Sequence, residues 1–250
     1  MKKKILTGLT ATLLFGTIAA SPTSCKTRRS ARRAAPAAVD TVKTQAGKSE
    51  TVADAIARLT DDDYREVAAR LGIEVATIKA VVEIEAGAAH EGFFRPGMPI
   101  INFDMSMFRK FAGKNGINLS KYYKSHAIVF SRPNAARHGS TQAAQHARLK
   151  AARTIHNETA IQGCFWGMFQ IGGFNWRRCG CASIDEFVEK MSHSERTQLE
   201  LFAEFVTNSG MLPHLQKKNW SAFARMYNGA SYASRGYHTR LANSYARHKR

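Results

Sequence analysis

The segment spanning residues 74–87 most constrains the fold, because it carries an acid in the middle of an otherwise apolar helix face. At about 100° per residue, Ile78, Val82 and Glu85 share one face, so Glu85 points where a core leucine is expected. Glu83 lies about 140° from Ile78 and is expected to face solvent. The pattern predicts a helix packed on the core with two non-equivalent glutamates near its end.

Gly87 is expected to end this helix and to leave Glu85 in the last turn. The negative end of the helix dipole and apolar neighbours both disfavour ionisation there, which raises the pKa of a carboxyl. An acid that stays protonated near neutral pH is a suitable general acid. The alternative is a structural glutamate at the margin of the apolar face, with its carboxylate reaching water.

The first fifty residues differ in character from the rest of the chain. Met1–Lys4 is basic and Ile5–Ala20 is an apolar run, too short for a stable membrane span but typical of a secretory signal. The signal can be cleaved after Ala20. Alternatively, it can be cleaved just before Cys25, which is then lipidated. Residues 1–25 therefore predict export to the bacterial cell envelope, either lipid-anchored in a membrane or free in the periplasm or outside.

Residues 26–50 are basic and poor in apolar side chains, which predicts a flexible linker ahead of one domain over residues 51–250. The net charge is +18, and loss of Lys2, Lys3 and Lys4 with the signal lowers it to +15. Such an excess favours anionic cell-envelope polymers or a lipid surface as partners of an exported protein. No nucleic-acid-binding motif accompanies the charge. Neither nucleic acid nor a protein partner is predicted.

Three cysteines fall within the domain: Cys164, Cys179 and Cys181. An oxidising compartment permits Cys164 to pair with either of the others, and buried free thiols are the alternative. The spacing lacks the second ligand pair of a zinc site, so neither a metal nor another cofactor is predicted.

The fold class is predicted to be mainly α, with a small β-hairpin or lip beside the helix that carries Glu85. Pro96–Pro99 predicts a turn and Ile100–Asp104 an extended segment, whereas Ile117–Ser140 is expected to be irregular. Ser192 and Glu195 have the spacing of a helix-capping box. Other helices are expected at Thr51–Arg58, Asp61–Leu71, Thr141–Ile161, Ile184–Lys190, Ser194–Asn208, Ser221–Tyr227 and Tyr237–Arg247.

The segment Cys164–Trp176 is too rich in glycine for a simple helix and too aromatic for a solvated loop. Trp166 supplies a flat surface on which a sugar can stack, while Gln170 and Asn175 can bond hydroxyl or acetamido groups. The alternative is an ordinary aromatic core cluster with a glycine turn. Further on, Tyr227-Asn228-Gly229 marks a helix end.

These motifs occur in an order that resembles the lysozyme-like glycan cleavers, and more closely the N-acetylmuramidase family of phage endolysins and bacterial cell-wall hydrolases. The resemblance covers nearly all of residues 61–248. The matching segments are Leu71–Glu74, Ile78–Glu85, Pro99–Asp104, Trp166–Ile171, Gly173–Asn175, Gln198–Phe202, Tyr227–Gly229 and Tyr237–Ala242.

The resemblance implies a lysozyme-like fold that cuts peptidoglycan between N-acetylmuramic acid and N-acetylglucosamine, with Glu85 as the catalytic acid. Asp104 is the candidate second acid, with a hairpin-capping role as its alternative, and Glu83 and Glu91 are weaker candidates. Substrate binding is assigned to Trp166, Gln170, Asn175, Tyr227 and Asn228. The Tyr227 hydroxyl is expected to hold either the Glu85 carboxyl or the substrate.

The sequence departs from the family pattern at four positions: Ala86 replaces a usual Ser, Asp104 a usual Glu, Phe165 a Ser and Gly172 a Met. These changes affect the expected substrate preference more than the reaction class. Two alternatives remain beside hydrolysis. One is a lytic transglycosylase that cuts the same bond and leaves a 1,6-anhydro product, and the other is a basic cell-wall-binding protein without activity.

Overall fold

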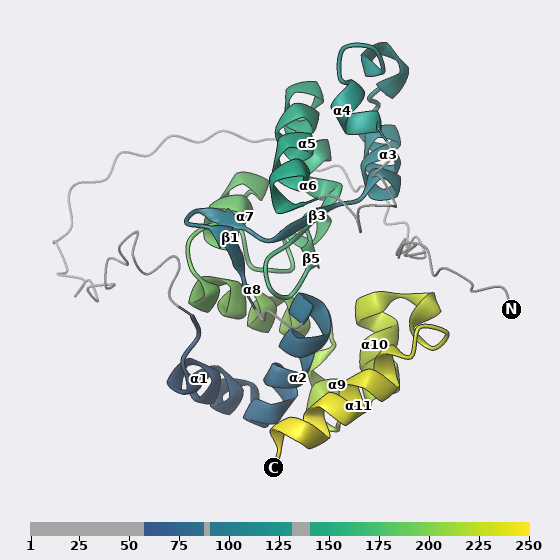
Figure 1. Ribbon diagram of the computed structural model, residues 1–250. Coiled ribbons are helices and arrows are strands. Elements are labelled where there is room, and N and C mark those ends of the chain that lie inside the picture. Colours follow the sequence, from purple (N-terminus) through teal and green to yellow (C-terminus); the bar gives the residue numbers. More distant parts are fainter. Residues whose placement is uncertain (1–57, 88–90, 132–140) are drawn as a thin grey trace, which may run out of the picture.

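A computed structural model describes residues 58–87, 91–131 and 141–250, and these residues form a mostly helical domain with two small antiparallel sheets. The predicted signal segment with Cys25, the predicted linker and nearly all of the expected helix Thr51–Arg58 lie outside the described residues. Figure 1 shows α3 to α6 at the top, α1, α2 and α9 to α11 at the bottom, and the strands between them. The predicted fold class is confirmed.

The first two helices form where the sequence predicts them. Helix α1 (Asp61–Leu71) begins with a capping box, in which the Thr60 side chain accepts from the Asp63 amide and the Asp63 side chain accepts from the Thr60 amide. It ends at Gly72, which has a left-handed backbone. Helix α2 (Val75–Ala86) follows and ends at Gly87. Its apolar face is buried in the core.

The C-terminal helix α11 (Tyr237–His248) packs along α2, and Glu83 joins the two. Its carboxylate accepts from the Ser244 hydroxyl at 2.7 Å, pairs with Arg247, and contacts His248 Nε2 at 2.9 Å. The expectation that Glu83 faces solvent is therefore wrong. The periodicity placed it correctly on the side away from the core, but a second helix covers that side.

The two sheets lie beside the end of α2. Strands β1 (Phe93–Arg95) and β2 (Met98–Pro99) form the predicted hairpin, with its turn at Pro96-Gly97. In the second sheet β3 (Ile101–Phe103) pairs with β4 (Cys164–Trp166), which pairs with β5 (Ile171–Gly172). The predicted lip thus receives partners from a segment more than sixty residues further along the chain.

The helices between the two halves of this sheet differ in part from the prediction. Helix α3 (Met105–Lys114) was not predicted, and the irregular stretch after it contains η3 (Leu119–Tyr122) and α4 (Ala127–Phe130). The single helix predicted over Thr141–Ile161 is two helices, α5 (Gln142–Ile155) and α6 (Asn157–Gln162). His156 separates them because its backbone is extended and its Nδ1 accepts from the Thr159 amide, which caps α6.

The remaining helices complete the core around buried aromatic rings. The expected capping box at Ser192 and Glu195 is wrong, because Ser194 caps α8 instead and Glu195 turns inward, where it accepts from the amides of Leu59 and Gly92. The elements of this part are η5 (Gly173–Asn175), α7 (Ile184–Met191), α8 (Glu195–Asn208), α9 (Leu212–Gln216), α10 (Trp220–Asn228) and η6 (Ala230–Tyr232).

Cys164, Cys179 and Cys181 are buried free thiols, which agrees with the second of the two alternatives considered for them. Burial raises the pKa of each thiol, that of Cys181 to about 11. Within the described ranges, no helix combines the length and apolar character needed to cross a bilayer.

Candidate active site

Glu85 lies in the last turn of α2, partly buried, as the sequence predicts. Burial raises the pKa of its carboxyl to about 7, and this effect outweighs two influences that lower the pKa, a hydrogen bond from Asn228 and the charge of Arg240. The Asn228 side-chain amide donates to Glu85 Oε1 at 3.0 Å. The group is therefore divided between its protonated and ionised forms near neutral pH.

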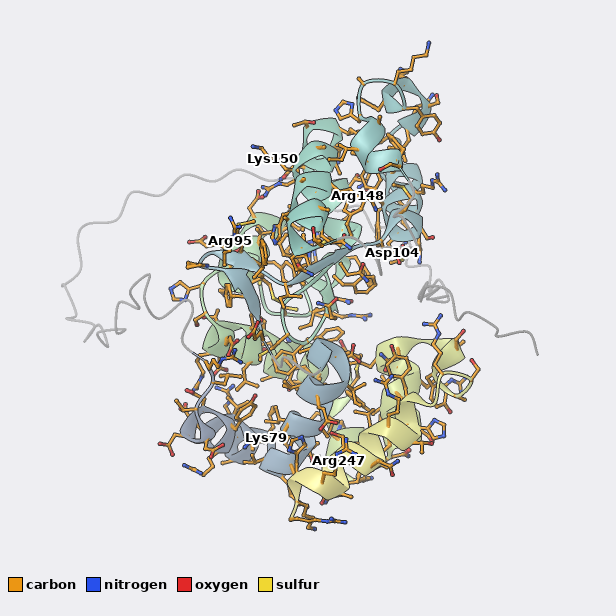
Figure 2. The ribbon with its side chains drawn as sticks, viewed as in Figure 1. Lys79, Arg95, Asp104, Arg148, Lys150 and Arg247 are labelled. Carbon is orange, nitrogen blue, oxygen red and sulfur yellow. The ribbon has the colours of Figure 1, made fainter. Side chains whose placement is uncertain are left out.

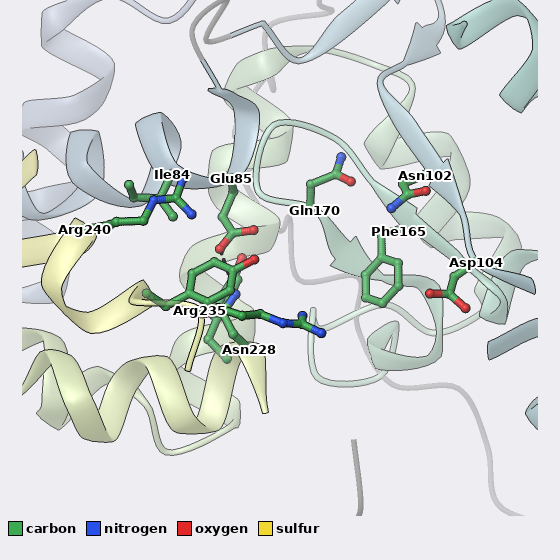
Figure 3. A pocket seen from close by; sticks show the side chains of 11 residues that line it. Ile84, Glu85, Asn102, Asp104, Phe165, Gln170, Asn228, Arg235 and Arg240 are labelled. Carbon is green, nitrogen blue, oxygen red and sulfur yellow. Dashed lines mark hydrogen bonds between the residues drawn. The ribbon is translucent and has the colours of Figure 1, made fainter. Parts of the chain in front are cut away.

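The carboxyl opens into a cavity of about 330 Å³ (Figure 3). Figure 3 shows Glu85 and Asn228 on one side, Asn102, Phe165 and Asp104 on the other, and Gln170 between them. The residues that line the cavity are Ile84, Glu85, Asn102, Asp104, Phe165, Gln170, Tyr227, Asn228, Arg235, Tyr237 and Arg240. The helix end, the small sheet and the C-terminal helices thus converge on one polar space.

Gln170 reaches the cavity from a tight turn between β4 and β5. Its backbone has a positive φ of 46°, its amide donates to the Gly167 carbonyl, and its side-chain Nε2 donates to the same oxygen at 2.9 Å. Gly167, with a φ of 68°, has no room for a side chain, because a Cβ there would lie 2.7 Å from Gln198 Oε1. At Gly167 the backbone therefore packs directly against the Gln198 side chain.

Gln198 is the positioning residue that the sequence analysis missed. Its buried side chain accepts from the Met168 amide at 2.9 Å and donates to the carbonyls of Gly92 and Met191. The side-chain amide of Gln198 therefore joins three chain segments, those that contain Gly92, Met168 and Met191. Position 198 belongs to one of the segments matched to the family, which is the only signal that pointed to it.

Tyr227 closes the cavity floor from α10. Its hydroxyl donates to the Phe169 carbonyl at 2.6 Å, which joins the Gln170 turn to the helix end that carries Asn228. Phe169 is fully buried and stacks on Phe202 at 4.3 Å, and Tyr227 packs against the same ring. The hydroxyl therefore holds neither Glu85 nor an open substrate position. The carboxyl is held by Asn228 instead.

Asp104 lines the cavity but also caps α3. Its Oδ1 accepts from the Met107 amide at 2.9 Å, and the residue is 8% exposed. Asp104 thus caps helix α3, whereas the alternative role expected for it was to cap a hairpin. Its carboxylate remains the second carboxyl among the described residues that line the cavity.

Three other predicted residues lie elsewhere. The Trp166 side chain is 2% exposed, donates its indole N–H to the Ile161 carbonyl and packs on Phe187, so it is part of the core and does not line the cavity. Asn175 belongs to η5 and is not among the lining residues. Glu91 forms an ion pair with Arg58 outside the cavity. Phe165, the neighbour of Trp166 on β4, lines the cavity instead, together with Tyr227 and Tyr237.

Arg235, Tyr237 and Arg240 are lining residues that the sequence analysis did not assign. The Arg240 guanidinium lies over the Tyr237 ring at 5.5 Å, and burial raises the pKa of the Tyr237 hydroxyl. The segment that contains Tyr237 and Arg240 was matched to the family, but no chemical role followed from that match. In the described part of the chain, no group of three or more His, Cys, Asp or Glu side chains is arranged to hold a metal ion.

A mostly helical domain with a small sheet and a polar cavity, in which burial raises the pKa of one carboxyl to about 7, is the architecture of a lysozyme-like glycoside hydrolase. The chain belongs to the N-acetylmuramidase family, whose model matches residues 74–249. Its structure is similar to the crystal structure of the Burkholderia AP3 phage endolysin, with a TM-score of 0.64 and 32% sequence identity. The match covers 77% of this chain and 72% of that chain. Among curated proteins, none matches the sequence significantly.

We predict that Glu85→Gln stabilises the protein at alkaline pH. The folded-state pKa of Glu85 is raised to about 7 from 4.5, so the favourable contribution of the protonated group is present at low pH and is lost as pH rises from about 4.5 through 7. Glutamine carries no charge at any pH. Relative to the wild type, the variant should gain about 2–3 kcal/mol in free energy of unfolding between pH 5 and pH 8.5, measured by urea denaturation. A difference in free energy of unfolding between the variant and the wild type that does not grow over this pH range would contradict the prediction.

Proposed function

We propose that this protein hydrolyses the glycan strand of peptidoglycan between N-acetylmuramic acid and N-acetylglucosamine, with Glu85 as the general acid. Family membership supports a glycoside hydrolase that acts on peptidoglycan. The observation that carries the proposal is the Glu85 carboxyl at the wall of a polar cavity, whose pKa burial raises to about 7, so that a substantial fraction is protonated near neutral pH. Glycoside hydrolysis needs one such proton donor beside the bond that breaks.

In the proposed reaction, Glu85 donates its proton to the glycosidic oxygen while the bond from that oxygen to the anomeric carbon breaks. The bonding electron pair stays with the leaving oxygen, and positive charge develops on the sugar ring. The Asn228 amide donates to Oε1, so we assign the transferred proton to Oε2. The same hydrogen bond from Asn228 and the positive charge of Arg240 then stabilise the carboxylate that remains.

Three polar groups support the binding of a sugar in the cavity. The buried Asn228 Oδ1 has no partner among the described residues, and an acetamido N–H or a hydroxyl of the substrate can donate to it. Gln170 reaches the same space, and Asn102 is exposed on β3 beside it. Phe165 offers the apolar surface that was expected of Trp166.

The second half of the reaction requires attack on the anomeric carbon. For hydrolysis, we propose that Asp104 activates the attacking water from the side of the cavity opposite Glu85 (Figure 3). One observation favours the alternative, a lytic transglycosylase, because Asp104 Oδ1 is already engaged by the Met107 amide. A transglycosylase needs one acid, since a hydroxyl of the substrate itself attacks and a 1,6-anhydro sugar forms.

Glu85→Gln is expected to lower the rate of wall digestion about 10²- to 10⁴-fold, the usual contribution of a general acid. Release of soluble fragments from purified peptidoglycan measures this rate, and circular dichroism verifies the fold. The wild-type rate should fall as pH rises through about 7, because the donor loses its proton there. Glu189→Gln is the matched control and should keep the wild-type rate. An active Glu85→Gln variant would exclude Glu85 as the acid, while wall binding without digestion by the wild type would indicate a binding protein.

The two reaction types are separated by the ends of the products. Hydrolysis through Asp104 predicts reducing N-acetylmuramic acid ends in the mass spectrum of the digest, together with a loss of activity of about tenfold or more in Asp104→Asn. Asparagine retains an acceptor oxygen for the Met107 amide, so the cap of α3 is preserved in this variant. The appearance of 1,6-anhydro ends, with full activity in Asp104→Asn, would instead establish the transglycosylase.

A further inference from the structure

Charge is distributed unevenly along the chain. Between Asp104 and Glu158 the sequence contains no Asp or Glu but ten Lys and Arg residues, whereas nineteen acids are spread over the rest of the 250 residues. The described residues of this segment form α3, η3, α4 and α5, which stand together at the top of Figure 1. We call residues 105–131 and 141–155 the basic lobe.

Cations on the basic lobe have no carboxylate of their own lobe to pair with. The exposed ones include Arg109, Lys114, Lys121, Lys124 and Lys150. Figure 2 shows Lys150 on α5, far from Lys79 and Arg247 at the other end of the molecule. Cations outside the lobe are often matched, as where Arg196 pairs with Asp63, Glu66 and Glu200.

The part of the basic lobe that contains η3 and α4, residues 119–130, is here called its tip, and it also exposes apolar side chains. Tyr123 is 49% exposed and Ile128 is 47% exposed, and both are large hydrophobic residues within a few positions of Lys121 and Lys124. Tyr123 is held in place, because its ring contacts Phe130 edge to face at 4.6 Å. Two exposed apolar side chains and two exposed lysines therefore lie within eight consecutive residues, 121–128.

A buried arginine fixes this tip to the rest of the lobe. Arg148, on α5, is 6% exposed and donates to the carbonyls of Ser131 at 2.8 Å and Ile128 at 3.3 Å. These bonds satisfy carbonyl groups at the end of α4. The exposed position of Ile128 is therefore a fixed feature of the fold.

We propose that the tip of the basic lobe docks on the surface of an anionic lipid bilayer. Tyr123 and Ile128 enter the boundary between headgroups and acyl chains, while Lys121 and Lys124 extend their ammonium groups to the lipid phosphates. An anionic polymer would use the lysines but would gain little from the two apolar side chains. The export signal expected at the N-terminus would bring the protein to such a surface.

Docking in this way also orients the cavity. Helix α3 begins directly after Asp104, which lines the cavity, and the chain then continues through η3 to the tip. A bilayer that holds the tip therefore fixes the distance and direction of the cavity relative to the membrane. This inference does not depend on the catalytic role of Glu85, so each can fail without the other.

The test is co-sedimentation with vesicles of phosphatidylcholine containing one third phosphatidylglycerol. The exported form is used, with Cys25→Ala to prevent lipid attachment and Glu85→Gln to protect the expressing host from digestion. Lys121→Gln/Lys124→Gln should weaken binding about 25-fold, about fivefold per lysine. Ile128→Ser, which removes no ring contact, should weaken it several-fold. Pure phosphatidylcholine vesicles should bind far more weakly than the anionic ones.

The control is Lys217→Gln/Arg225→Gln, which removes two exposed cations near α9 and α10, at the opposite end of the molecule. It should retain binding within about threefold. Equal binding by the Lys121→Gln/Lys124→Gln variant and the wild type would overturn the proposal. The proposal would also fail if Ile128→Ser bound vesicles normally while the lysine variant lost binding to soluble polyphosphate as well, because this result would identify a polymer site.

Discussion

The removal of one carboxyl from water is the constraint on which the rest of this structure depends. Glu85 takes a position that an apolar residue would fill, and burial raises its pKa to about 7. The partners that stabilise its charge are few, chiefly the Asn228 amide and the more distant Arg240. A stronger partner would lower the pKa and would leave the site without a proton donor at neutral pH. The proposed chemistry therefore requires that the groups around Glu85 stabilise its negative charge only weakly.

Such a carboxyl needs walls that do not move, because a movement that exposed it further to water would shift its pKa back toward the ordinary value. The Tyr227 hydroxyl joins α10 to the Gln170 turn through the Phe169 carbonyl, and the stacked rings of Phe169 and Phe202 support this bond from below. Gln198 holds the other end of the same turn through the Met168 amide. The walls of the cavity are thus held by hydrogen bonds between distant segments, which the hydrophobic pattern of the sequence does not predict.

Features that depend on residues close together in the sequence could be predicted from it, whereas features that depend on contacts between distant segments could not. The position of Glu85 in the last turn of α2 and the ends of α1 and α2 were predicted correctly, because periodicity, caps and glycines act within a few residues. The prediction that Glu83 faces solvent was wrong, because α11, from a distant part of the chain, covers it. Trp166 was assigned to the cavity and lies in the core, since alternation along a strand does not reveal which side is covered. Gln198 was missed because a buried amide has no sequence signature, and its partners come from three segments.

The most direct test of this account is a carbon-13 NMR titration of the Glu85 side-chain carboxyl in the substrate-free protein, with Glu85→Gln used to assign the resonance. The account predicts a midpoint near pH 7. A Glu85 midpoint near the ordinary value of 4.5 would contradict it, because the carboxyl would then be ionised at neutral pH and unable to donate the proton.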